Sequence, residues 1–170
     1  MFPCDPLQPE RILKILSEVN VIDRIAKTLL NVYEGTYSLC NTLEIQNGVL
    51  ATFVPSEEIG NALPPIILYI QPNLDQEGMT NAVDQCLQTH DQYHRLPVIL
   101  FISSNKPTEP FFAPFKPVPS KPHLYFLPNA AWCCKCFLLP NNFDNGFIHQ
   151  DDLSSLPSLL LEGNHSASKT

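Results

Sequence analysis

The chain has 170 residues, of which 44% are hydrophobic and only 16% are charged. A domain of this length buries enough surface to need no disulfide or metal to complete its core, and the low share of charged residues argues against disorder. The net charge of −7, with ten scattered Lys and Arg residues, argues against strong nucleic-acid binding, because that affinity comes from cations that neutralise phosphates. We expect a single domain over residues 1–163 and a flexible tail over residues 164–170.

Apolar residues near the N-terminus recur at three- and four-residue steps, which predicts one amphipathic helix over residues 9–31. A β-hairpin follows. Asn47 and Gly48 mark its turn, because both residues tolerate positive φ. The β-prone segments around it lie at residues 37–39, 42–45 and 49–54.

Two continuous apolar runs, at residues 64–71 and 97–102, predict central strands buried on both faces. A helix that begins at Asp75 lies between them, so the two strands should be adjacent and parallel. The predicted apolar stripe of this helix consists of Met79, Val83, Cys86, Leu87, His90 and Tyr93.

Residues 103–122 hold six prolines and three phenylalanines. This composition predicts a long loop of polyproline character and not a regular helix. Phe111, Phe112 and Phe115 either pin the loop to the domain, the favoured interpretation, or form a recognition surface. Further elements are expected as strands at residues 123–127 and 133–139 and as a helix at residues 151–161.

The six cysteines and the first residues bear on the compartment. Met1–Pro6 has neither the basic nor the apolar region of a signal peptide, and no apolar run approaches the ~18 residues of a membrane span. We therefore expect an intracellular protein, nuclear or cytoplasmic, with reduced thiols and no membrane partner. Cys133, Cys134 and Cys136 with His123 have poor spacing for zinc, and buried free thiols are the favoured interpretation.

The order helix, hairpin, buried strand, helix, buried strand resembles the core of the PD-(D/E)XK nucleases, which have a restriction-endonuclease-like fold. Leu63–Gln71 and His94–Leu100 are similar to the transposase-like, recombination-promoting nucleases, especially uncharacterised fungal members. Those proteins typically carry Pro-Pro, three apolar residues, Glu, an apolar residue and Gln, and later a Trp before Lys-Cys and an aromatic residue, as in Trp132–Phe137. The resemblance covers residues 63–161 and implies an α/β fold with a mixed central sheet flanked by helices.

The chemistry that the resemblance implies needs two carboxylates to hold Mg²⁺, one from the hairpin and one from the buried strand. Gln71 matches the last motif residue, but Tyr69 stands at the Glu position, and the hairpin contains no Asp. The resemblance therefore implies a degenerate domain derived from a mobile element, without catalysis or cofactor. Such a domain would act by binding, with a protein partner expected and weak nucleic-acid binding possible.

Three alternatives stay open at the level of sequence. The first is an active Mg²⁺-dependent DNA endonuclease with a relocated acid. The second is a protein-interaction module that uses the segment 103–122. A Cys/His hydrolase built from Cys86, His90 and His94 is disfavoured, because Cys86 and His90 lie on the predicted apolar stripe. The candidates for a relocated acid are Glu44, Glu57, Glu58 and Asp75.

Overall fold

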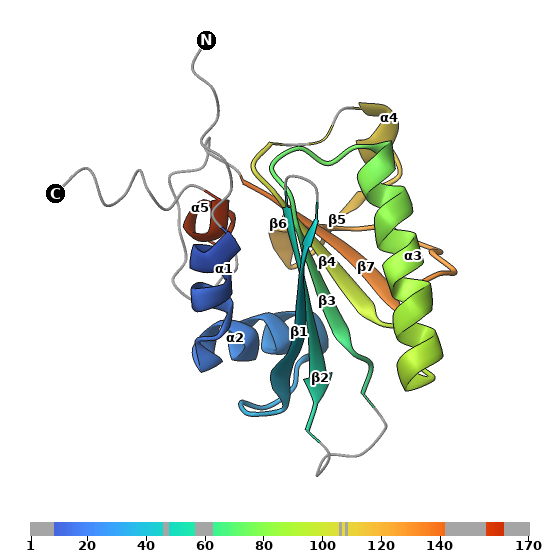
Figure 1. The fold of residues 1–170 in the computed structure, drawn as a ribbon. Coiled ribbons are helices and arrows are strands. Elements are labelled where there is room, and N and C mark those ends of the chain that lie inside the picture. Colours follow the sequence, from blue (N-terminus) through green and yellow to red (C-terminus); the bar gives the residue numbers. More distant parts are fainter. Residues whose placement is uncertain are drawn as a thin grey trace, which may run out of the picture.

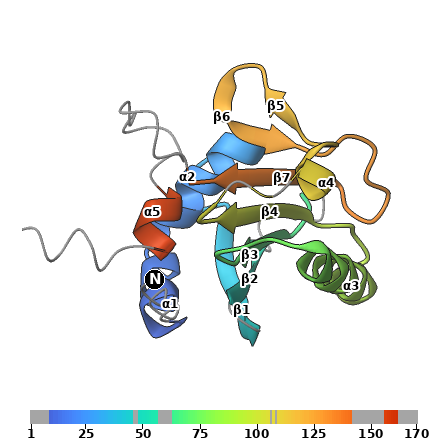
Figure 2. The same ribbon diagram turned by 90° about the horizontal axis from the view of Figure 1, so that it is seen from above.

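The computed structural model describes residues 9–45, 48–56, 63–105, 107, 109–141 and 156–161. A seven-stranded mixed sheet in the order β1-β2-β3-β4-β7-β6-β5 forms the centre. Helices α1, α2 and α5 cover one face, and α3 and α4 lie on the other (Figures 1 and 2). The elements are α1 (Pro9–Leu16), α2 (Val19–Leu30), β1 (Tyr37–Ile45), β2 (Gly48–Pro55), β3 (Ile66–Ile70), α3 (Gln76–Tyr93), β4 (Val98–Ser103), α4 (Glu109–Phe112), β5 (Lys116–Val118), β6 (Lys121–Phe126), β7 (Lys135–Pro140) and α5 (Leu156–Leu161).

The middle of the sheet is parallel, which confirms the prediction from the two apolar runs. β3 pairs in parallel with β4, with Ile66 beside Val98, and β4 pairs in parallel with β7. Antiparallel meanders flank this centre, with β1 and β2 on one side and β6 and β5 on the other. Every residue of β3 and β4 is buried, because elements pack on both faces of the sheet there.

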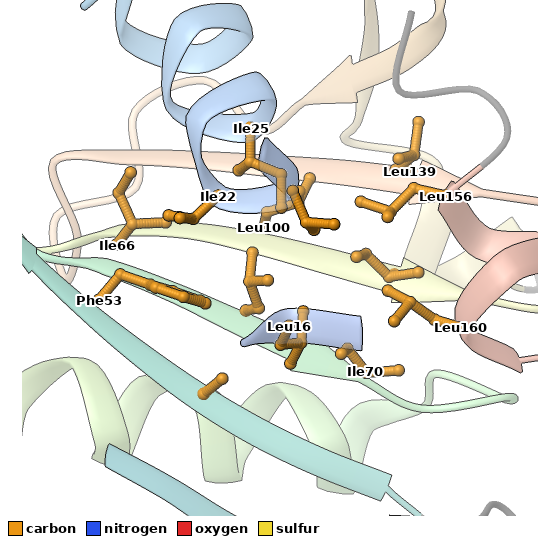
Figure 3. Close-up of a cluster of buried hydrophobic side chains, with 14 of the residues drawn as sticks. Leu16, Ile22, Ile25, Phe53, Ile66, Ile70, Leu100, Leu139, Leu156 and Leu160 are labelled. Carbon is orange, nitrogen blue, oxygen red and sulfur yellow. The ribbon is translucent and has the colours of Figure 1, made fainter. Parts of the chain in front are cut away.

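The core on the α1–α2–α5 face consists of aliphatic side chains from the helices and from alternate strand positions. Leu16 of α1 and Ile22 and Ile25 of α2 lie in one cluster with Ile66 and Leu100 of the sheet (Figure 3). The intervening strand positions, such as Ile67 and Tyr69, belong to a second core cluster beneath α3. The alternation along β3 therefore places Tyr69 on the α3 face.

Residues 9–31 form two helices and not the single helix that periodicity predicts. The break falls at Ser17 and Glu18, and Glu18 is extended, with φ −71° and ψ 123°. Ser17 Oγ donates to the Lys14 carbonyl oxygen at 2.8 Å, which satisfies a carbonyl at the end of α1. The two helices run in different directions (Figure 1). The change of direction lets both apolar stripes reach the same face of the sheet.

The buried stripe of α3 also differs from the predicted one. Leu87 is 46% exposed, His90 is exposed, and Met79, Val83 and Tyr93 are only half-buried. Small residues hold the buried positions, because they allow the helix backbone to lie close to the sheet, whereas hydrophobicity patterns give them little weight. The buried residues are Gly78, Ala82, Cys86 and Thr89.

The proline-rich segment 103–122 contains a turn of helix, α4, and a strand, β5, where a loop was predicted. Pro110 is the second residue of α4, where a missing N–H costs no intrahelical hydrogen bond. Pro117 lies in β5 at the edge of the sheet, the position in which strands tolerate proline.

The remaining predicted elements have counterparts where the chain is described. The hairpin forms, with Ile45 paired to Gly48, while Gln46 and Asn47 lie outside the described residues. The predicted strands at 123–127 and 133–139 correspond to β6 and β7, and α5 is the end of the predicted last helix. Residues 151–155 and the predicted tail lie outside the described residues.

Candidate functional site

The motif residues of the first buried strand lie where β3 ends and α3 begins. Tyr69 is 1% exposed, and its ring packs against Phe101 with the centroids 5.4 Å apart. Gln71 directly follows β3, and its backbone N–H donates to the Ile102 carbonyl oxygen at 3.0 Å. Open α/β sheets bind ligands at the carboxyl ends of their parallel strands, so this is the candidate site.

Three oxygens converge on the first turn of α3. Asp75 caps the helix, and its Oδ1 accepts a hydrogen bond of 2.8 Å from the Gly78 N–H. A Cβ atom on Gly78 would stand 2.8 Å from Gln71 Oε1, 3.4 Å from Asp75 Oδ1 and 3.5 Å from the Tyr69 hydroxyl. The structure thus brings together three of the residues that the sequence singled out.

Gly78 is a site residue that the sequence analysis missed. Its signal was a glycine in the first turn of a helix, where glycine costs about 1 kcal/mol relative to alanine. The missing side chain leaves the space into which the three oxygens point, so the cluster around Gly78 depends on this residue.

The Tyr69 hydroxyl is neutral in this environment. Burial raises the pKa of Tyr69 above its ordinary 10.0, the Asn81 side chain lowers it in part, and the charges of Asp75 and Glu77 raise it further. The hydroxyl is buried without a hydrogen bond of ordinary geometry among the described residues, although Asn81 is near enough to act on its pKa. A protonated phenol does not replace a carboxylate as a ligand for Mg²⁺, which favours charged oxygen donors.

The other candidate acids lie elsewhere. Glu44 pairs with Val49 of β2, and Val49 belongs to the core on the α1–α2–α5 face. Directly paired side chains share a face, so Glu44 is directed away from Tyr69. The hairpin residue that pairs with Tyr69 is the apolar Leu50. Glu57 and Glu58 lie outside the described residues.

Among the candidate acids that the structure describes, Asp75 is therefore the one that borders Gln71 and Tyr69. Within the part of the chain that the structure describes, no group of three His, Cys, Asp or Glu side chains is arranged to hold a metal ion. The residues of the zinc alternative are all described, and they form no such group. They are Cys133, Cys134, Cys136 and His123.

The phenylalanines of the segment 103–122 face the interior. Phe111 and Phe115 are buried and stacked, with ring centroids 5.8 Å apart. Phe112 is half-buried and meets Tyr125 edge-on at 4.9 Å. These contacts pin the segment to the α3 face. A recognition surface on this segment would have to use exposed side chains other than these three phenylalanines.

The Cys/His arrangement considered for hydrolysis is not formed. Cys86 is fully buried beneath α3, whereas His90 and His94 are exposed. His90 Nδ1 lies 3.9 Å from Asp91 Oδ1. The thiol is thus enclosed in the core, whereas both imidazoles reach the solvent.

Two cavities lie away from the cluster around Gly78. One of about 760 Å³ runs along α2 and is lined by polar residues that include Arg24, Lys27 and Lys121. The other, of about 430 Å³, is mostly apolar and lies beside β5, β6 and β7, with Phe126 and Phe137 in its wall. The candidate site is thus defined by converging oxygens and not by either cavity.

Comparison of the chain with protein-family models, curated proteins and solved structures finds no match in any of the three. The nuclease resemblance therefore depends on the motif residues and the order of the elements. Among the described helices, none combines the length and the hydropathy that a membrane crossing requires.

Proposed function

We propose that this chain is a nuclease-like domain that does not cleave DNA and acts by binding, chiefly to a protein. The observation that carries this proposal is the chemistry of the cluster around Gly78. It pairs the neutral phenol of Tyr69 and the amide of Gln71 with the carboxylate of Asp75, which already accepts a hydrogen bond from the backbone of α3. Metal-dependent cleavage of this type needs a second carboxylate, and Leu50 stands on the hairpin opposite Tyr69.

The order of the elements supports a nuclease-like ancestry. α2 precedes the antiparallel meander β1-β2-β3, and α3 then connects β3 to the parallel strand β4. Tyr69 and Gln71 stand at the end of β3 beside α3, at the two motif positions that the resemblance assigns to Glu and Gln. The origin from a mobile element is part of the same proposal and is supported by the sequence resemblance alone.

Incubation of the purified chain with supercoiled plasmid and Mg²⁺ or Mn²⁺ tests the absence of cleavage. We expect no nicking. We also expect none from Tyr69→Glu, because that variant still lacks a carboxylate on the hairpin side. Metal-dependent nicking by the unmodified chain contradicts the proposal.

The second candidate function is a Mg²⁺-dependent endonuclease that uses Asp75. The approach of the Asp75 carboxylate to Gln71 Oε1 and the Tyr69 hydroxyl is the observation that favours it. The Asp75→Asn variant separates the two functions, because asparagine retains a helix-capping oxygen but loses the charge. Nicking that is present in the unmodified chain and lost in Asp75→Asn establishes the endonuclease.

The distribution of exposed apolar groups supports a protein partner. Leu39 and Leu43 are exposed on β1, which lies at the edge of the sheet, and the exposed Tyr33 precedes that strand. A sheet edge has unpaired backbone groups that an extended segment of another protein pairs with. The net charge of −7 opposes binding to phosphates.

A cross-linking experiment tests β1 as the binding surface. Cys40 lies between the two leucines and is exposed, so a photoreactive maleimide can be attached there in a Cys4→Ser, Cys134→Ser background. We expect covalent capture of a protein, reduced strongly by Leu39→Lys with Leu43→Lys. Capture that is unchanged in the double-lysine variant excludes β1 as the surface, and selective capture of labelled DNA contradicts the protein-binding proposal.

A further inference from the structure

The mostly apolar cavity beside β5, β6 and β7 has the size of a small-molecule site. Its volume is about 430 Å³, and such sites typically span roughly 300–1,000 Å³. The three strands form the end of the sheet opposite to β1, away from α1 and α3 (Figure 2). The cavity is therefore separate from the cluster around Gly78 and from the binding surface proposed on β1.

Two aromatic side chains give the cavity much of its apolar wall. Phe126 of β6 pairs directly with Phe137 of β7, so their rings lie on the same face of the sheet. Val118 of β5 and Leu127 add aliphatic surface. All four side chains are only half-buried. Apolar surface that surrounds a hollow and stays partly open to water is a feature of ligand sites.

Lys135 is the one charged residue among the described residues that line this cavity. It lies two positions before Phe137 on β7, so the two side chains project from the same face. Lys135 is exposed, and no ion pair between it and another described residue is found. An exposed lysine keeps its ammonium in water while its stem lies along apolar surface. The positive charge therefore stands at the open side of the cavity.

The segment that builds the cavity is cationic, although the chain as a whole is acidic. Residues 110–141 contain Lys116, Lys121 and Lys135 and neither Asp nor Glu, whereas the net charge of the chain is −7. Lys121 Nζ is engaged elsewhere, because it donates to the Thr28 carbonyl oxygen at 2.8 Å, and Lys116 does not line the cavity. A local excess of positive charge attracts anions, and Lys135 is the cation placed to hold one here.

We propose that this cavity binds a small organic acid, with the carboxylate at Lys135 and the apolar body against Phe126 and Phe137. The apolar wall accepts hydrophobic molecules in general. The ammonium of Lys135, with no acid among the described lining residues, selects an anion over a neutral or cationic molecule of the same shape. Aliphatic and aromatic carboxylates share this chemistry. The site is independent of the proposed binding function.

Competition with anilinonaphthalene sulfonate, a fluorescent aromatic anion, tests the class of ligand on the full chain at neutral pH. Octanoate, octanol and octylamine carry the same hydrocarbon chain with a negative, a neutral and a positive end. We expect octanoate to displace the probe at a concentration roughly two- to five-fold lower than octanol, the range of an exposed ion pair. Each further methylene of the carboxylate should tighten binding by roughly four-fold. Equal displacement by octanol, or tighter binding of octylamine, overturns the proposal.

The same competition with naphthoate distinguishes the two kinds of acid. Tighter binding of naphthoate than of octanoate identifies an aromatic carboxylate as the ligand, and the reverse order identifies an aliphatic one. Failure of both acids to displace the probe overturns the proposal.

Replacement of Lys135 by glutamine removes the charge and keeps a side chain of similar length. We expect Lys135→Gln to lose the preference for octanoate over octanol. Lys116→Gln is the matched control, because Lys116 is also an exposed lysine on a strand but lies outside the cavity wall, and it should keep the preference. A preference that survives in Lys135→Gln, or that is lost equally in both variants, contradicts the assignment to Lys135.

Cys134 provides a readout in the unmodified chain. It lines the cavity and is exposed, whereas the exposed Cys40 lies on β1. Saturating octanoate should slow the native alkylation of Cys134 by N-ethylmaleimide several-fold and leave the rate at Cys40 unchanged, as measured by peptide mapping. Unchanged alkylation of Cys134 at octanoate concentrations that displace the probe places the ligand elsewhere and overturns the proposal.

Discussion

Replacement of Tyr69 by phenylalanine removes one oxygen from the interior and tests whether that oxygen has a stabilising partner. The ring is enclosed between α3 and the sheet and packs on Phe101. Phenylalanine preserves the ring and these contacts. The substitution therefore isolates the hydroxyl, which points toward Gly78 in a space without a hydrogen bond of ordinary geometry among the described residues.

The expected magnitude follows from two opposing contributions. Burial of a hydroxyl without a compensating hydrogen bond costs roughly 1–3 kcal/mol in proteins, and a hydrogen bond from Asn81 would offset roughly 0.5–1.5 kcal/mol of that cost. We therefore expect Tyr69→Phe to raise the free energy of unfolding by about 1 kcal/mol. For a chain of this size, that change raises the Tm by about 2–4 °C.

Urea unfolding, followed through the fluorescence of the single tryptophan, Trp132, measures the change. Tyr93→Phe is the matched control, because the Tyr93 hydroxyl lies 3.1 Å from Cys40 Sγ and its removal should destabilise the fold slightly. A loss of more than about 1 kcal/mol in Tyr69→Phe would refute the reasoning, since it requires a strong buried hydrogen bond. A coupling energy above about 0.5 kcal/mol with Asn81→Ala would identify Asn81 as that partner.

Three further predictions concern α3 and the buried tyrosines. Ala82→Leu should lower the free energy of unfolding by about 1–3 kcal/mol through overpacking, whereas Leu87→Ala, on the exposed side of α3, should change it by less than about 0.5 kcal/mol in the same urea assay. A larger loss in Leu87→Ala than in Ala82→Leu would mean that the buried side of α3 is the one predicted from the sequence. Asp75→Ala should cost about 1 kcal/mol through loss of the helix cap, with Asp75→Asn close to neutral as its control. Because burial raises the pKa of Tyr37 and of Tyr69 above 10.0, these two side chains ionise first in the unfolded chain, so their contribution to stability should be constant below pH 10 and should be lost as the pH rises above it. In a spectrophotometric titration, two of the five tyrosines should therefore ionise only as the chain unfolds, and ionisation of all five before unfolding would contradict this.

Hydrophobic periodicity correctly predicted the strands that are buried through long apolar side chains. It missed the buried side of α3, which consists of small residues, and the break between α1 and α2. The runs that became β3 and β4 are apolar at every position, as strands covered on both faces must be. The stripe of α3 was displaced because Gly78 and Ala82 hold buried positions that hydrophobicity does not mark. The single predicted helix over residues 9–31 was wrong because periodicity is blind to the local bond that Ser17 makes at the end of α1.

Much of the candidate site could be predicted because it is local. Tyr69, Gln71 and Asp75 lie within seven residues of sequence, and a strand that turns directly into a capped helix brings their oxygens together. Gly78 extends this to the first turn of the same helix. A pattern of spacing along one short segment is therefore enough to identify the cluster, although it does not give the distances.

The side of the cluster that faces the hairpin could not be predicted, because it depends on register. Tyr69 is paired with Leu50, and Glu44 with Val49, which points to the opposite face. A slip of one residue between β1 and β2 would turn every side chain of β1 to the other face and would place Glu44 on the side of Tyr69. The acid that two-carboxylate chemistry needs is thus present in the hairpin sequence but is directed away by the pairing of Ile45 with Gly48. The lack of a second carboxylate near Tyr69 among the described residues is a property of this register and not of the amino-acid composition.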